Sequence, residues 1–370
     1  MIDARFYGLE HAGLGRYTIN LISQISKLDH ENKYTLLLRK KYFDSLNLPS
    51  NFQKVLAEVR HYSLKEQILI PQIIDNRQPD IVHFPHLNIP LFWKGKFVLT
   101  LHDLTMQRQS KDATTLPLAL YYAKRVPFLL TARKAVKGSV KIIVPSQTVK
   151  KEVVDFYKIP EEKIVVIYEG MTDLMKSPKR PGAYNPKEPY FIYVGNAYPH
   201  KNLKSAIEAV ALLNKKAVEK ITFAIGGSRS VFSQRLTRLI ADLKAEKYVR
   251  ILGGIPDLDL GVLYKNSLAY VYPSLSEGFG LQGLEAMSAG TLVLASDIPV
   301  FREIYGDNAI YFDPRKATSI TEAMKKSIEI GEKERARIIN RARQFSHKYS
   351  WKKMAESTLQ VYRSTYAQKN

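Results

Sequence analysis

The sequence predicts an α/β protein with two doubly wound, Rossmann-like domains that face a ligand-binding cleft. Short runs rich in β-branched residues alternate with longer segments whose apolar residues have helical spacing, which is typical of parallel α/β units. The length of 370 residues exceeds what a single hydrophobic core usually serves. Residues 170–189 are rich in proline and glycine and separate two such series, so they contain the best linker candidate.

Each domain is predicted from its own series of strands. In the first half the candidate strands are residues 34–38, 81–84, 97–101, 141–144 and 163–167, and in the second half residues 190–194, 221–225, 249–252, 269–272, 291–295 and 309–312. Helical spacing occurs at residues 203–213, 234–243, 283–288, 320–330 and 350–366. We therefore expect a first domain at residues 1–172, a linker at 173–189, a second domain at 190–349 and a C-terminal helix within 350–370.

The composition excludes several classes of protein. The chain has no cysteine, which excludes a disulfide framework, a thiolate zinc site and a cysteine nucleophile. No stretch reaches the roughly 20 uninterrupted apolar residues that a membrane-spanning helix needs. The N-terminus lacks a basic segment followed by an apolar one. We therefore expect an unexported, cytoplasmic protein.

The formal net charge of +21 is spread evenly, with +11 in the first 185 residues. Such a charge favours anionic partners, whether phosphorylated small molecules, membrane headgroups or nucleic acid. Residues 113–151 contain eight Lys or Arg and no acidic residue. Region 116–151, which mixes these charges with leucine and aromatic residues, is compatible with a peripheral contact at the inner membrane surface. It is equally compatible with a domain helix that has a solvated basic face.

The densest cluster of candidate site residues lies at residues 274–290, where an apolar strand leads into a helix. Gly278 and Gly280 let backbone N–H groups approach a ligand, and the helix N-terminus adds partial positive charge, a combination suited to a diphosphate. Glu277, before the helix, and Glu285, about one turn inside it, can accept hydrogen bonds from sugar and ribose hydroxyls. The alternative is a glycine-rich turn whose glutamate serves the helix dipole.

A second glycine pair, Gly13 and Gly15, is predicted in a loop between a short first strand, which begins almost at Met1, and the first helix. It resembles a dinucleotide fingerprint without its third glycine, because Thr18 occupies that position. A phosphate or sugar contact and a plain turn both remain open here.

Polar residues follow other predicted strands, whose carboxyl ends face the ligand crevice in a parallel sheet. His102, next to Asp103, can hydrogen-bond a substrate hydroxyl, although such a histidine is more often a satisfied polar group. Lys201, which follows Asn196, can place a point charge on a diphosphate or be an exposed lysine at a helix start. Arg229 follows a Gly-Gly turn that offers a backbone nest for an anion.

These motifs, in this order, resemble the retaining glycosyltransferases of family 4, which have the GT-B fold. The similarity extends from near residue 2 to about residue 366. Its most specific element is the paired-glutamate segment SEGFGLQGLEAMSAG. It is supported by the GLGRY loop, the HDLT segment, the segment VGNAYPHKNL and the pair Arg302-Glu303. The resemblance implies an acceptor-side first domain, a nucleotide-sugar-binding second domain and a terminal helix that crosses back onto the first domain.

The resemblance also implies roles for individual residues. His102 and Glu277 would lie close to the reacting sugar, Glu285 would bind the ribose hydroxyls and Lys201 the phosphate. His200 stands where the family often has arginine, so one phosphate charge is either missing or supplied by Arg229. The other residues expected to bind the donor are Gly13, Gly15, Asn196, Gly254, Ile255, Gly278, Phe279, Gly280 and Leu281.

The expected activity is transfer of a hexose of mannose or glucose type from a nucleotide-diphosphate sugar to a hydroxyl of a glycan or lipid-linked acceptor. The resemblance implies retention of configuration, with no metal and no cofactor besides the nucleotide sugar. Three alternatives remain: a glycoside hydrolase, which also pairs carboxylates; a sugar-nucleotide epimerase of the same fold; and a basic nucleic-acid binder. No RNA-binding signature is present, so we expect no nucleic-acid partner.

Overall fold

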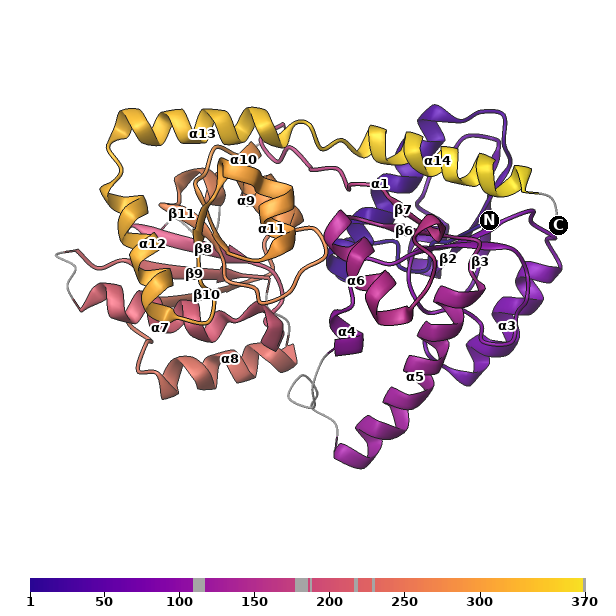
Figure 1. The fold of residues 1–370 in the computed structure, drawn as a ribbon, viewed down its shortest axis with the longest axis horizontal. Helices are drawn as coiled ribbons and strands as arrows, with labels where there is room; N and C mark the ends of the chain where they lie inside the picture. Colours follow the sequence, from indigo (N-terminus) through magenta and orange to yellow (C-terminus); the bar gives the residue numbers. More distant parts are fainter. Residues whose placement is uncertain (109–116, 177–185, 187, 216–218, 228–229, 369–370) are drawn as a thin grey trace. The chain divides into compact units, whose positions relative to one another are not determined.

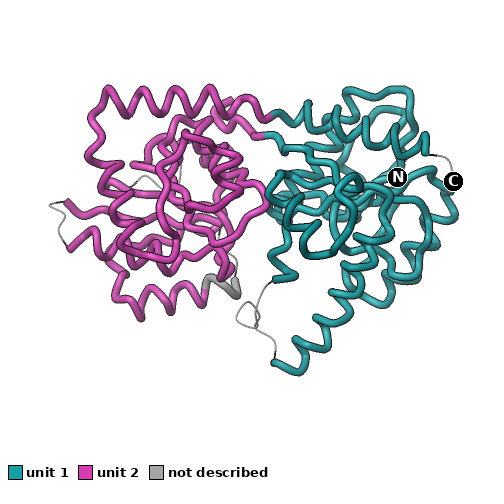
Figure 2. Tube along the Cα trace, viewed as in Figure 1, with its two compact units in different colours: residues 1–170, 350–370 teal, residues 171–349 magenta. Residues whose placement is uncertain are grey.

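The computed structural model describes residues 1–108, 117–176, 186, 188–215, 219–227 and 230–368, of which residues 230–233 are described by their backbone alone. The chain forms two compact units, shown in Figure 2. Unit 1 contains residues 1–170 and 350–370, and unit 2 contains residues 171–349. Unit 1 is therefore built from two separate parts of the chain.

Unit 1 has a parallel sheet of seven strands among its described residues, in the order β3-β2-β1-β4-β5-β6-β7. The strands are β1 (Ile2–Asp3), β2 (Tyr34–Leu38), β3 (Phe52–Leu56), β4 (Val82–Phe84), β5 (Phe97–Thr100), β6 (Lys141–Val144) and β7 (Ile164–Val166). The helices are α1 (Ala12–Leu28), α2 (Lys40–Phe43), α3 (Leu64–Asp75), α4 (Thr105–Arg108), α5 (Leu118–Gly138), α6 (Gln147–Tyr157) and α14 (Trp351–Ala367), with 3₁₀ turns η1 (Leu9–His11) and η3 (Glu161–Lys163).

Helix α14 is the part of unit 1 that comes from the end of the chain. It packs against α1 (Figure 1) and buries Trp351, Met354 and Leu359. The Tyr362 hydroxyl lies 2.5 Å from Nδ1 of His83, a buried side chain in β4. A side chain at Gly170 would collide with the Trp351 backbone, because its Cβ would lie 2.1 Å from the Trp351 nitrogen. Glycine at position 170 therefore lets the two parts of unit 1 approach closely.

Unit 2 has a parallel sheet of six strands among its described residues, in the order β10-β9-β8-β11-β12-β13. The strands are β8 (Tyr190–Val194), β9 (Thr222–Gly226), β10 (Val249–Gly253), β11 (Ala269–Tyr272), β12 (Val293–Ser296) and β13 (Ile310–Phe312). Helices cover both faces of this sheet (Figure 1). They are α7 (Leu203–Asn214), α8 (Ser230–Asp242), α9 (Asp257–Asn266), α10 (Leu281–Ser288), α11 (Pro299–Tyr305), α12 (Ala317–Glu329) and α13 (Glu332–Ser346), with 3₁₀ turns η4 (Pro199–Lys201) and η5 (Gly306–Asn308).

The structure confirms the predicted fold class and every predicted strand, with bounds that differ by two residues at most. It adds β3 at the edge of the first sheet, which the sequence did not predict. It also corrects the location of Gly13 and Gly15: both lie in the first turn of α1, not in a loop.

Candidate active site

In unit 2, Lys201 and Glu277 form an ion pair at the carboxyl edge of the sheet. Lys201 follows β8 and Glu277 follows β11, and these two strands are neighbours in the sheet, so their loops meet. Lys201 Nζ lies 2.6 Å from Glu277 Oε1, and the two side chains are 14% and 11% exposed. Water screens such a pair less than it screens a pair on the surface. The pair therefore places one positive and one negative charge where a ligand of this edge would lie.

Helix α10 begins at Leu281, four residues after Glu277 in the sequence. Gly280 is its N-cap residue with a φ of 96°, and no side chain caps the helix there. A Cβ at Gly280 would lie 2.3 Å from the Tyr305 hydroxyl, which donates a hydrogen bond to the Gly280 carbonyl at 2.5 Å. Glycine is therefore required both for the left-handed backbone and for the close approach of Tyr305. The uncapped N–H groups and the helix dipole make this end of α10 suitable for an anion.

Two further predicted donor-binding residues lie on elements of the same sheet edge. Glu285, on α10, is only 2% exposed. Asn196 follows β8 and accepts a hydrogen bond from the Tyr193 hydroxyl at its backbone carbonyl. Its side-chain oxygen is buried and has no hydrogen bond to any residue that the structure describes. Because buried polar atoms are normally paired, this amide oxygen is a candidate acceptor for a ligand group.

The loops after β8, β9 and β10 are joined by backbone hydrogen bonds. The Gly195 nitrogen donates to the Gly226 carbonyl at 3.0 Å, and the Gly227 nitrogen donates to the Gly253 carbonyl at 2.6 Å. The predicted residues Gly254 and Ile255 directly follow this connection.

Among the remaining predicted residues, Gly278, Phe279 and Leu281 are buried around the start of α10, and Arg229 lies outside the described residues.

In unit 1, His102 lies just after β5 and is held at both ring nitrogens. Its Nδ1 is 2.9 Å from Glu169 Oε1 and its Nε2 is 3.2 Å from the Pro85 carbonyl. Glu169 Oε1 and the Pro85 carbonyl can both accept a hydrogen bond, and a neutral imidazole donates to one of them at a time. The ring of Tyr17 packs edge-on against it at 4.8 Å. Sequence reasoning assigned Glu169 no role; the available signal was a carboxylate shortly after the last strand of the first domain.

The first turn of α1 explains the predicted glycine pair. A Cβ at Gly15 would lie 1.8 Å from the Gly8 carbonyl, so this glycine lets the helix start close to the preceding loop. A Cβ at Gly13 would meet nothing within 4 Å. Gly15 therefore has a packing role in addition to any ligand contact, whereas Gly13 leaves open space at the helix start.

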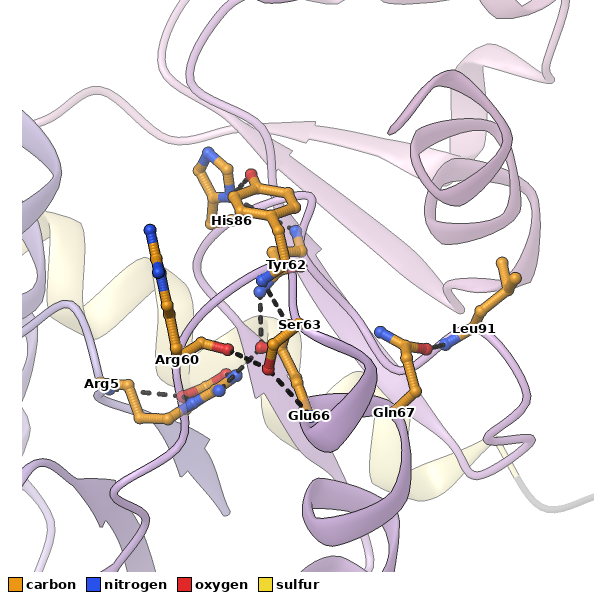
Figure 3. Close-up of polar contacts among 10 residues, drawn as sticks. Arg5, Arg60, Tyr62, Ser63, Glu66, Gln67, His86 and Leu91 are labelled. Atoms are coloured by element: carbon orange, nitrogen blue, oxygen red, sulfur yellow. Dashed lines mark hydrogen bonds and ion pairs between the residues drawn. The ribbon is translucent and has the colours of Figure 1, made fainter. Parts of the chain in front are cut away.

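Sequence reasoning missed a buried charged network at the carboxyl edge of the first sheet, shown in Figure 3. Arg5 is almost fully buried and donates to both carboxylate oxygens of Asp3, at 2.8 and 2.6 Å. It also pairs with Glu66 at 2.7 Å, and Asn88 donates to the same carboxylate at 2.6 Å. Burial opposes ionisation of Asp3, but Arg5 outweighs it and lowers the pKa of that carboxyl. The network thus holds together segments around residues 3–5, 66 and 88, which are far apart in the sequence.

Among the described residues, no group of three or more histidine, aspartate or glutamate side chains is arranged to hold a metal ion. None of the described helices is long and apolar enough to cross a membrane.

Two family models match the chain, one to each part. The model "Glycosyltransferase Family 4" matches residues 11–172, and the model "Glycosyl transferases group 1" matches residues 175–345. The chain belongs to glycosyltransferase family 4. As a member of this family it is an enzyme, a glycosyltransferase.

Individual proteins are similar to this chain over most of its length. The O-antigen chain mannosyltransferase RfbU of Salmonella typhimurium is 28% identical over 86% of this chain and 88% of its own length. The O-antigen chain mannosyltransferase B of Escherichia coli is 26% identical over 95% of this chain and 96% of its own length. The solved structure of Anabaena Alr3699/HepE in complex with UDP and glucose has 17% identity and a TM-score of 0.71, and covers 98% of each chain. The fold of this family 4 glycosyltransferase is therefore GT-B.

Proposed function

We propose that this enzyme transfers a hexose, with mannose the first candidate, from a nucleotide-diphosphate sugar to a hydroxyl of a glycan or lipid-linked acceptor. The observation that carries the proposal is the arrangement of Lys201, Glu277 and the uncapped start of α10 at one sheet edge. The two mannosyltransferases similar to this chain favour mannose. The complex of the similar Anabaena structure with UDP and glucose supports a nucleotide donor.

The proposed chemistry is substitution at the anomeric carbon with retention. The bond from that carbon to the diphosphate oxygen breaks, and a bond to the acceptor hydroxyl oxygen forms on the same face of the sugar. The hydroxyl proton passes to the leaving diphosphate, so no side chain serves as a nucleophile. Lys201 and the N-terminus of α10 would stabilise the negative charge that develops on the diphosphate.

The carboxylates have binding roles in this proposal. Glu285 would accept hydrogen bonds from the ribose hydroxyls, and Glu277 would contact the donor sugar while it holds Lys201. His102, held by Glu169, would contact a sugar hydroxyl. The remaining donor contacts would come from backbone groups and from the amide of Asn196.

A donor screen tests the proposal. The protein would be melted with UDP-, GDP- and ADP-sugars, because a ligand at about 100 times its Kd stabilises the native state by about 2.7 kcal/mol. We expect one nucleotide class to raise Tm, and sugar transfer to an acceptor glycan without added metal. Failure of every nucleotide sugar to bind would refute the proposal. Product analysis separates the epimerase alternative, which would release an isomerised nucleotide sugar without an acceptor.

We also propose that α5 contacts an anionic membrane surface, which suits a lipid-linked acceptor. Its N-terminal half extends away from the rest of unit 1 (Figure 1) and contains no acidic residue. Residues Leu118, Tyr122, Val126 and Leu130 are each more than half exposed. Their spacing of four residues places them in one stripe along the helix, with basic residues nearby in the sequence.

Vesicle sedimentation tests this contact. We expect the protein to bind vesicles of phosphatidylglycerol and phosphatidylcholine and to lose binding in the double variant Val126→Asp/Leu130→Asp. The matched control is Phe156→Asp, which changes an exposed apolar residue on α6. Equal binding by both variants would show that α5 is not the contact.

A further inference from the structure

The backbone of Tyr62 is held in a conformation that an aromatic residue rarely adopts. Tyr62 has a φ of 59°, in the left-handed region, and its side chain is 51% exposed. This conformation costs free energy for any residue with a Cβ, and such strain is concentrated at functional positions. An exposed tyrosine gains little from burial that would offset the cost. The position therefore calls for a role beyond packing.

The buried network of unit 1 imposes this conformation (Figure 3). The Tyr62 nitrogen donates a 2.7 Å hydrogen bond to Glu66 Oε2. The other oxygen of Glu66 is bound by Arg5 and by Asn88, at 2.7 and 2.6 Å. Ser63 caps α3 by accepting a hydrogen bond from the Glu66 nitrogen. These contacts hold the backbone at Tyr62 in its left-handed conformation.

The Tyr62 ring lies against His86 and Phe128, with ring centroids 6.2 and 6.3 Å away. His86 directly follows Pro85, whose carbonyl contacts His102. The Tyr62 hydroxyl lies 3.2 Å from His86 Nδ1, and the Asn88 nitrogen donates to the same Nδ1 at 3.3 Å. Because the Asn88 nitrogen can only donate, His86 Nδ1 is an acceptor and its proton lies on Nε2. Burial lowers the pKa of His86 to about 4, so the ring is neutral at physiological pH.

The Nε2–H group of His86 is therefore a donor with a defined direction. It makes no hydrogen bond to any residue in the described part of the chain. In Figure 3 this nitrogen points away from the Tyr62 contact. The ring of Phe6 packs against the His86 ring, with centroids 5.2 Å apart, and stacks on His61 at 3.8 Å. An aromatic face and a neutral N–H donor thus stand side by side at the carboxyl edge of the sheet.

We propose that Tyr62 and His86 form a binding platform for a pyranose ring of the acceptor glycan. A pyranose has an apolar C–H face, which stacks on an aromatic ring, and peripheral hydroxyls, which accept from a neutral N–H group. The ring of His86 is neutral, so its N–H group would donate a hydrogen bond to a hydroxyl without contributing charge. The Pro85 carbonyl lies 3.2 Å from His102 Nε2, so the platform adjoins the histidine that the family assigns to the reaction. This inference rests on the proposed transfer to a glycan.

The test measures sugar binding without the donor, by saturation-transfer NMR with methyl α-D-mannopyranoside, methyl α-D-glucopyranoside and methyl β-D-N-acetylglucosaminide as probes. We expect transfer to the ring protons of at least one probe in the wild-type protein. Tyr62→Gly should reduce it by about tenfold, the loss expected from removing one stacked ring. Glycine tolerates a positive φ, so this variant keeps the loop. Tyr62→Phe should retain most of the signal, and His86→Ala should weaken it.

The matched control is Phe92→Ala, which removes another exposed aromatic ring of unit 1. No transfer to any probe in the wild-type protein, or an equal signal in Tyr62→Gly, would overturn the inference. Donor binding is measured separately by thermal shift. If sugars bind through Tyr62 while no nucleotide sugar binds, the proposed function fails and the platform stands.

Discussion

Lys201 Nζ and Glu277 Oε1 lie 2.6 Å apart, and each side chain is almost covered by protein. A charge in such a position is stabilised mainly by its partner, so removing only one member leaves the other poorly solvated. We expect Lys201→Met to destabilise unit 2 by about 1–3 kcal/mol and to weaken donor binding. The double variant Lys201→Met/Glu277→Gln should recover much of the stability and none of the activity. Thermal unfolding and transfer assays measure the two effects; a double variant as active as the wild type would contradict the assignment.

Glu285 is the buried carboxylate of α10, and its proposed partners are ribose hydroxyls. Glu285→Ala should abolish transfer of the donor sugar while the fold is kept, as checked by circular dichroism. Glu285→Gln is the matched variant, since an amide accepts with one oxygen and should retain weak donor binding. Wild-type turnover in Glu285→Ala would remove this residue from the site.

Gly280 and Gly13 provide a matched pair of glycines. Gly280→Ala places a Cβ 2.3 Å from the Tyr305 hydroxyl on a backbone with φ of 96°, so we expect about 1–3 kcal/mol of destabilisation and weaker donor binding. Gly13→Ala meets open space in a helix and should leave stability unchanged or raise it by about 0.5–1 kcal/mol. Denaturant unfolding compares the two. Equal effects would show that the turn before α10 is less constrained than its geometry indicates.

Glu169 should act through His102. If the carboxylate mainly positions the imidazole, Glu169→Gln and His102→Phe should each lower kcat, and the double variant should be no worse than His102→Phe alone. Glu169→Gln can still accept a hydrogen bond from His102 and should retain more activity than Glu169→Ala. A fully additive double variant would indicate that the two residues act independently.

Burial lowers the pKa of His83 to about 3, against about 6.5 in an unfolded chain. Below pH 6.5 His83 becomes protonated in the unfolded state but stays neutral in the native state, so the free energy of unfolding falls as pH falls. His83 does not lower the free energy of unfolding above pH 6.5. Between pH 6.5 and 3 it lowers that free energy by up to about 1.4 kcal/mol per pH unit. Urea unfolding of His83→Gln should show a shallower decline with acidification than the wild type. An identical decline would mean that His83 is protonated in the folded protein.

The sheets could be predicted because buried parallel strands are continuous apolar runs. Strand β3, Phe52–Leu56, was not predicted because it lies at the sheet edge, where the exposed Gln53 and the half-buried Lys54 interrupt its apolar run. The candidate donor residues were predictable for a related reason. Glycines and carboxylates that directly follow predicted strands must gather at one edge of a parallel sheet.

The Tyr62 platform and the Arg5 network could not be predicted in the same way. Arg5, Glu66 and Asn88 are far apart in the sequence, and no spacing rule links them. A charged residue is expected at the surface, so nothing in the sequence indicates that Arg5 is almost fully buried. The left-handed backbone of Tyr62 follows from its bond to Glu66, which exists only after the loops have met.

Because unit 1 is built from two separate parts of the chain, it cannot fold completely early in synthesis on the ribosome. Unit 2 is one continuous piece, so it can complete its core as soon as residue 349 has been released from the exit tunnel. Unit 1, although synthesised first, lacks Trp351 and Tyr362 until the last helix emerges. Unit 1 is thus synthesised first but completes its core last, so its apolar core would be exposed to chaperones during synthesis.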